Sequence, residues 1–218
     1  SKWLFECSKE SVITHKFKKY IIPWPIDRNI FKRRDKIKLR KKYKIPINKK
    51  YIIYNAYNGI KDPRKGWDYL LKAIKISKES FDLLIIGEKK NLKIKEIKNR
   101  KIFSLGKINS DIKISEILNC ADLIVIPSKI DNLPQVGLEA QSCGLPVVTF
   151  NCNGLKDLVD HKKNGFLAKP YSPTSFSSGI DWILRRKSQK NLIQNSINKT
   201  KKNWDSNIVS KKYIGLYK

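Results

Sequence analysis

The sequence predicts an α/β fold in which helices cover both faces of a Rossmann-like parallel sheet, and three observations support this prediction. Short apolar, β-branched runs recur along the chain and suit strands that are buried on both faces. Segments with a helical spacing of apolar residues lie between these runs. Residues 121–150 read as strand, loop, helix and strand, and a unit of this length implies a right-handed parallel crossover.

The elements before this central unit follow from local signals. A helix is expected at 2–9 and a short strand at 20–22, after which Pro23 and Pro25 impose an extended linker. The other elements expected before residue 120 are a basic helix (36–43), a strand (51–55), a helix containing Leu70, Leu71 and Ile74, strands at 81–86 and 102–105, and helices at 91–99 and 111–119.

The central unit is bounded by proline and glycine. A strand at 123–126 ends at Pro127, and Pro134 suits the first turn of the next helix because its missing N–H costs nothing there. Gly144 caps that helix, and a buried strand follows at 146–150. The later elements are a turn and two helices, at 164–165, 172–185 and 189–203.

The net charge of the chain indicates which partners it could bind, and its cysteines indicate the cellular compartment. A net charge of +28 first suggests nucleic acid, but the Lys residues are scattered and no zinc-ligand spacing or RNA-binding aromatic motif accompanies them. A solvated basic surface is therefore preferred over a specific nucleic-acid site, and attraction to an anionic membrane surface is left open. Cys120 and Cys143 lie in apolar helix settings and read as small core residues. We expect a cytoplasmic protein, with peripheral contact to the inner face of the cytoplasmic membrane left open.

Two carboxylates lie in the central unit, where ligands of such sheets bind. Asp131 is in the loop and Glu139 is in the helix, and Pro134 rules out one continuous helix through both. We expect the loop to place Asp131 over the helix N-terminus, with Glu139 projecting from the side of the helix. The backbone N–H groups between them would form an anion site. This layout suits a nucleotide sugar; the alternative is that Asp131 only forms a turn and Glu139 is a solvated helix residue.

The segment PSKIDNLPQVGLEAQSCGLPVVTF closely resembles the donor-site motif of the retaining glycosyltransferases of family four, which have the GT-B fold. That motif has two acidic residues with seven between them, followed by a helix rich in small residues and a G-x-P-V-V strand. Asp131 and Glu139 match the acidic pair, although many members have the longer Glu at the first place. The DNLP variant resembles capsule and exopolysaccharide transferases.

Other parts of the chain fit the same resemblance. Lys65 precedes a glycine and matches the phosphate-binding Lys of the family, although on its own it could be an ordinary solvated loop residue. Most members have an Arg after the preceding glycine, whereas here Gly59 is followed by Ile60; Lys61 or Arg64 could substitute for that Arg. The family places the nucleobase just after the strand at 102–105, so Lys107 and Ile108 would line the base pocket.

The resemblance implies the domain organisation. Residues 1–22 would be a remnant of the amino-terminal acceptor domain, and residues 23–30 would be the hinge between domains, with Trp24 in place of the usual Asn. Residues 31–203 would be the nucleotide-sugar donor-binding domain, and residues 204–218 would form the carboxy-terminal helix that crosses back to the acceptor domain.

The resemblance also implies the function. The enzyme would move a sugar from a nucleoside diphosphate sugar to a glycan or lipid-linked acceptor, with retention and without a bound metal or other cofactor, in surface polysaccharide biosynthesis. Lys65 and the helix N-terminus would stabilise the leaving diphosphate. Asp131 and Lys65 carry the implied catalytic roles, and the implied donor-binding residues are Gly59, Lys65, Ile108, Asp131, Asn132, Leu133, Pro134 and Glu139. This chain alone would bind the donor and transfer little. The alternatives are a nucleotide-sugar epimerase or hydrolase of the same architecture and a basic, non-enzymatic polyanion-binding module.

Overall fold

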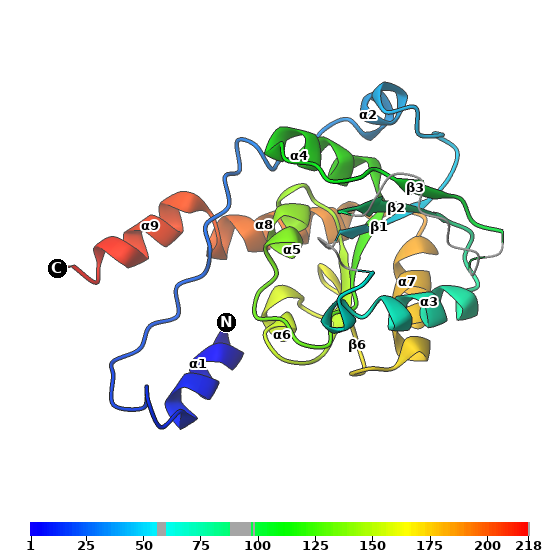
Figure 1. Cartoon of the computed structure of the whole chain (residues 1–218). Helices are drawn as coiled ribbons and strands as arrows, with labels where there is room; N and C mark the ends of the chain where they lie inside the picture. Colours follow the sequence, from blue (N-terminus) through cyan, green and yellow to red (C-terminus); the bar gives the residue numbers. More distant parts are fainter. Residues whose placement is uncertain (56–59, 88–96, 98, 218) are drawn as a thin grey trace.

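In the part of the chain that the structure describes, six strands form a single parallel sheet with helices on both faces, which confirms the predicted fold class (Figure 1). The computed structural model describes residues 1–55, 60–87, 97 and 99–217. The strands are β1 (Tyr51–Asn55), β2 (Asp82–Ile86), β3 (Ile102–Ser104), β4 (Leu123–Ile126), β5 (Val147–Phe150) and β6 (Gly165–Ala168). Their order in the sheet is β3-β2-β1-β4-β5-β6.

The helices divide between the two faces of the sheet (Figure 1). On one face, α3 (Trp67–Ile76) packs on α7 (Pro173–Leu184), which lies against β4, β5 and β6. On the other face, α5 (Gln135–Ser142) packs between α4 (Asp111–Cys120) and α8 (Lys190–Asn203). The remaining helices are α1 (Lys2–Glu10), α2 (Lys36–Lys42), the 3₁₀ turn η1 (Pro63–Lys65), α6 (Leu155–Leu158) and α9 (Ser206–Ile214).

The strand order creates a switch point between β1 and β4. The chain runs outward from β1 through β2 to β3, returns to β4 beside β1, and then runs outward in the opposite direction. The helices that follow β1 and β4, α3 and α5, therefore lie on opposite faces of the sheet, and in parallel sheets the region between two such connections is the usual place for a ligand.

One expected element is absent from the structure and another falls largely outside the described residues. The predicted strand at 20–22 is wrong, because these residues have no regular structure and Tyr20 and Ile21 are exposed. A strand requires a hydrogen-bonded neighbour, and the nearest ladder contact of this segment is an isolated bridge between Ile26 and Asp205. The predicted helix at 91–99 lies largely outside the described residues.

Asp122 ties α2 to the sheet at the amino end of β4. Its carboxylate accepts a hydrogen bond from the backbone N–H of Tyr51 at 2.7 Å. It also forms ion pairs with Lys36 at 2.6 Å and with the buried Arg40 at 2.9 Å. Three donors thus satisfy one largely buried carboxylate, which is the condition under which such a charge is tolerated.

The predicted hinge meets the end of α8. The Ile26 N–H donates to the carbonyl of Trp204 at 2.8 Å, and Arg28 pairs with Asp205 at 3.1 Å. Figure 1 shows this linker running from α1 past α8 toward α4.

Cys120 and Cys143 are buried free thiols, as expected of small core residues. No helix in the described part of the chain is long and apolar enough to span a membrane.

Candidate functional site

The loops after β1 and β4 touch at the switch point. The Lys129 N–H donates to the carbonyl of Arg64 at 2.7 Å. Gly66 starts α3 in the left-handed region, with φ of +68°, and a Cβ there would lie 1.9 Å from the carbonyl oxygen of Pro127. Only glycine combines this conformation with so close a backbone approach. Gly66 thus allows the two loops to pack together and places Lys65 beside the end of β4.

Lys65 is paired with Asp131. Its Nζ lies 2.9 Å from Oδ2 of Asp131, and the Lys65 side chain is one-third exposed. The turn η1 that carries Lys65 is capped by Asp62, which accepts from the Arg64 N–H at 2.9 Å. The family resemblance implied separate ligand contacts for Lys65 and Asp131, and the structure shows that these two residues are also in contact with each other.

The turn after β5 forms hydrogen bonds with the loop that carries Asp131. The Gly154 N–H donates to the Asp131 carbonyl at 3.1 Å, and a Cβ at Gly154 would lie 1.4 Å from the backbone oxygen of Asn132. The Asn153 side chain donates to the Lys129 carbonyl at 2.7 Å. The signal for this support was present in the sequence as the NCNG run, which local pattern reading alone does not connect to the loop.

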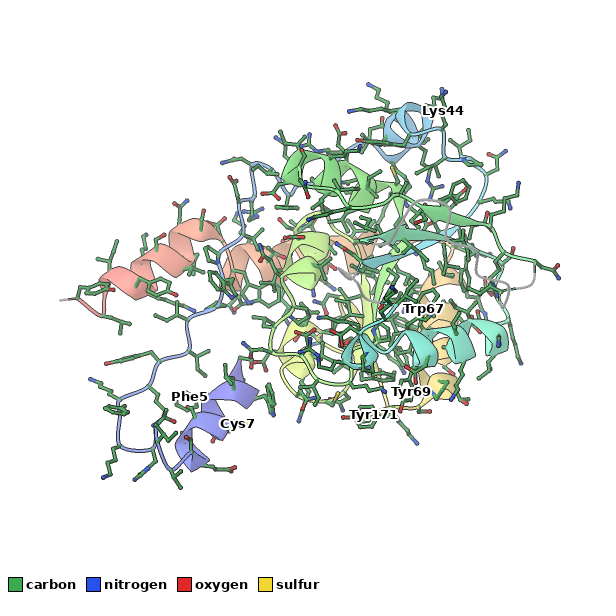
Figure 2. All side chains as sticks on the ribbon, viewed as in Figure 1. Phe5, Cys7, Lys44, Trp67, Tyr69 and Tyr171 are labelled. Carbon is green, nitrogen blue, oxygen red and sulfur yellow. The ribbon has the colours of Figure 1, made fainter. Side chains whose placement is uncertain are left out.

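A tyrosine pair supports the same loop from α3 and the segment after β6. The hydroxyl of Tyr171 donates to the Lys129 carbonyl at 3.2 Å. Tyr69 and Tyr171 lie next to each other in Figure 2, with ring centroids 6.1 Å apart. Lys129 is therefore fixed through its backbone from three directions, which leaves little freedom to the loop that follows it.

The helix α5 begins at this loop with an open N-terminus. Pro134 is its N-cap, one position earlier than the first-turn place expected for it, and it makes no side-chain capping hydrogen bond. Within the described residues the first N–H groups therefore have no side-chain cap, and they form a site suited to an anion. At the other end Gly144 has φ of +75° and its N–H donates to the carbonyl of Gln141, which confirms the predicted glycine cap.

A pocket of about 440 Å³ lies over this N-terminus. It brings together Lys65, Asp131 and the loop residues Asn132, Leu133 and Pro134 from the predicted set. Three further groups of lining residues were not predicted, namely Trp24 from the linker, Asn55 from the end of β1, and Gln135 with Val136 from α5. One cation, Lys65, and the start of α5 therefore share a single cavity with the carboxylate of Asp131.

Glu139 and Ile108 are not among the residues that line this pocket. Glu139 is only 9% exposed, so the alternative reading of a solvated helix residue does not describe it. Burial raises the pKa of the Glu139 carboxyl to about 7; the charge of Asp111 on α4 adds to this, and a hydrogen bond from Gln135 opposes it. Glu139 therefore faces toward the start of α4.

The other predicted residues are placed as follows. Ile108 is partly buried against the core in the connection from β3 to α4. Gly59 lies outside the described residues. Asn132 accepts a hydrogen bond from the hydroxyl of Ser1, and Leu133 is buried. Within the described ranges, no three His, Cys, Asp or Glu side chains gather as metal ligands.

Relatives of this chain are known from several organisms. An uncharacterised glycosyltransferase of Methanocaldococcus jannaschii is 28% identical over 209 residues, which are 91% of this chain and 52% of the relative. The Campylobacter jejuni enzyme named N,N'-diacetylbacillosaminyl-diphospho-undecaprenol alpha-1,3-N-acetylgalactosaminyltransferase is 30% identical over 105 residues, which are 48% of this chain and 28% of that enzyme.

Solved structures share the fold. Sucrose-phosphate synthase from Thermosynechococcus elongatus superposes with a TM-score of 0.84 at 18% identity, over 98% of this chain and 55% of that one. HepE of Anabaena, solved in complex with UDP-glucose, gives a TM-score of 0.74 at 21% identity, over 91% of this chain and 57% of that one. At these identities the likeness concerns the fold alone.

The extent of the matches defines what this chain represents. It spans about half the length of the M. jannaschii relative and of the two solved structures. Residues 35–199 match the family model described as Glycosyl transferases group 1, and this range includes the whole sheet, Lys65, Asp131 and Glu139. The chain belongs to the group 1 family of glycosyl transferases.

Proposed function

We propose that this chain is the donor-binding part of a retaining glycosyltransferase that moves a sugar from a nucleoside diphosphate sugar to a glycan or lipid-linked acceptor. The observation that carries the proposal is the pocket at the switch point, where Lys65, Asp131 and the uncapped N-terminus of α5 converge. Such a pocket offers donors for a diphosphate next to an acceptor for sugar hydroxyls.

The diphosphate would lie against the start of α5 and Lys65. As the bond to the sugar breaks, negative charge grows on the leaving diphosphate, and the ammonium of Lys65 and the helix N–H groups offset it without a metal. Lys65 has three N–H donors, so it can contact a phosphate oxygen while keeping Asp131 within 2.9 Å. Asp131 would then accept hydrogen bonds from the sugar.

The nucleoside would extend from the pocket toward α4. Glu139 lies on that side, near Asp111, and its carboxylate can accept from the two ribose hydroxyls. Ile108 lies in the neighbouring connection and would contact the base. Hydrogen bonds from the hydroxyls favour the charged form of Glu139, so binding of the nucleoside would lower the raised pKa of this carboxyl.

The names of the relatives support the substrate classes. HepE was solved with UDP-glucose, and the C. jejuni enzyme is named for a diphospho-undecaprenol-linked acceptor. In our proposal the acceptor is accordingly a glycan or a lipid-linked acceptor, the process is surface polysaccharide synthesis, and the place is the cytoplasmic side of the membrane. Residues 1–22 would belong to the acceptor domain, 23–30 to the hinge, 31–203 to the donor domain and 204–218 to the crossing segment.

Calorimetry with UDP, GDP and ADP tests the proposal. Replacing Lys65 by Ala should weaken the binding of the tightest nucleoside diphosphate about ten- to a hundredfold, because a hydrogen bond to a charged group contributes about 1.5–3 kcal/mol. The affinity for the matching nucleoside should stay nearly unchanged. Part of this loss would come from the unpaired charge of Asp131, so the double variant with Asp131→Asn should recover some affinity for the diphosphate.

Lys49→Ala is the matched control. Lys49 also pairs with a carboxylate at 3.0 Å, that of Asp82, but at the opposite end of the strands. It should leave nucleotide affinity unchanged. Failure of the wild-type chain to bind any nucleoside diphosphate would overturn the proposed function, and equal losses in the Lys49 and Lys65 variants would remove Lys65 from the site.

A further inference from the structure

Trp24 is an exposed aromatic side chain on the rim of the donor pocket. It is 69% exposed, whereas Trp67 and Trp204 are 8% and 5% exposed and belong to the core. It lines the same cavity as Lys65 and Asp131. Packing within the described residues therefore does not account for this large apolar ring, and its position suggests that it contacts a ligand bound in the pocket.

The backbone around Trp24 is restrained. Pro23 and Pro25 fix their own φ angles and restrict the residue before each of them, which includes Trp24 itself. Two residues later, the buried Ile26 donates its N–H to Trp204 at 2.8 Å. An indole on so short a tether can be held beside the pocket with little loss of backbone entropy when a ligand binds.

The order of groups along the site identifies which part of a ligand would reach Trp24. Glu139 and Ile108 lie toward α4 and outside the lining of this pocket. Lys65 and the start of α5 supply the anion-binding groups, and Asp131 and Trp24 share the cavity with them. A nucleotide sugar whose nucleoside points to Glu139 would pass its diphosphate over α5 and bring its sugar to Asp131 and Trp24.

We propose that Trp24 is the platform on which the sugar ring of the donor rests, so that it determines sugar affinity and selectivity. This inference rests on the proposed function and adds one residue to it. A pyranose has faces made of C–H groups, which carry a small positive charge and pack well on the negative face of an aromatic ring. Asp131 would accept hydrogen bonds from the hydroxyls at the edge of the same ring, so the two residues read different parts of one sugar.

The test compares each nucleoside diphosphate with its glucose conjugate, using UDP, GDP and ADP and measuring affinity by calorimetry on the full 218-residue chain. In the wild type, the glucose conjugate should bind more tightly than the nucleoside diphosphate for at least one of the three bases. Trp24→Ala should weaken the conjugate about two- to tenfold and leave the diphosphate unchanged, whereas Trp24→Phe should keep part of the gain because a ring is still present.

Phe17→Ala is the matched control, because Phe17 also lies between α1 and α2, is 67% exposed and does not line the pocket. It should change neither affinity. Equal loss of diphosphate and conjugate in Trp24→Ala would overturn the proposal, and so would an unchanged sugar increment. Those results would leave the proposed function intact, whereas a wild type that binds neither ligand would overturn both.

Discussion

Replacing Glu139 by Gln should make the protein more stable at alkaline pH. Glu139 is 9% exposed and lies near the charge of Asp111, so its ionised form is disfavoured in the folded chain. Gln has nearly the same shape and carries no charge, so the substitution removes the penalty without creating a cavity. A stabilising substitution in a buried position is unusual, which makes the outcome informative.

The pKa gives the size and the pH range of the effect. A rise from 4.5 to about 7 corresponds to about 3 kcal/mol between the two protonation states. Because the folded pKa is the higher one, stability is greatest below the unfolded pKa and falls as pH rises toward 7. The free energy of unfolding of the wild type should therefore be lower than that of the Gln variant by about 1 kcal/mol at about pH 5 and by about 3 kcal/mol at about pH 8.

Urea unfolding of both proteins across this pH range measures the difference. Glu116→Gln is a control of opposite sign, because hydrogen bonds from Lys42 and Tyr43 lower the pKa of Glu116. That variant should be less stable than the wild type at neutral pH, and the deficit should shrink as pH falls through the folded pKa of Glu116. If the difference in stability between wild type and Glu139→Gln did not change with pH, the carboxyl of Glu139 would have the same pKa in the folded and unfolded chain and would not be buried from solvent.

Three further results are expected. Gly154→Ala should displace the loop beneath the pocket, because the added Cβ would overlap the backbone of Asn132; calorimetry should show loss of nucleoside diphosphate binding together with a lower midpoint of unfolding. Asp122→Asn should destabilise the fold by about 3 kcal/mol in urea unfolding, because it leaves the buried guanidinium of Arg40 without its carboxylate. Because of the net charge of +28, RNA should bind nonspecifically at low salt and be released steeply as salt rises, while nucleoside diphosphate binding changes much less in the same salt titration.

Local patterns in the sequence are enough to place most helices and strands and the central motif. The repeats of apolar residues that define strands and helices are local, and proline and glycine mark their ends, so the strands at 51–55 and 123–126 agree with β1 and β4. The spacing of Asp131 and Glu139 across Pro134 likewise placed one carboxylate in a loop and the other in a helix. The strand at 20–22 failed because a strand depends on a neighbour that no local pattern reveals.

The direct contact between Lys65 and Asp131, and the presence of Trp24 in their pocket, depend on the tertiary structure. Lys65 and Asp131 are 66 positions apart and meet because β1 and β4 are neighbours at the switch point. Trp24 lines the same cavity although it belongs to a linker that precedes the first strand of the sheet in the sequence. The burial that raises the pKa of Glu139 also depends on α4 packing beside α5. Contacts of this kind arise from the packing of whole elements, and the spacing of residues along one segment carries no information about them.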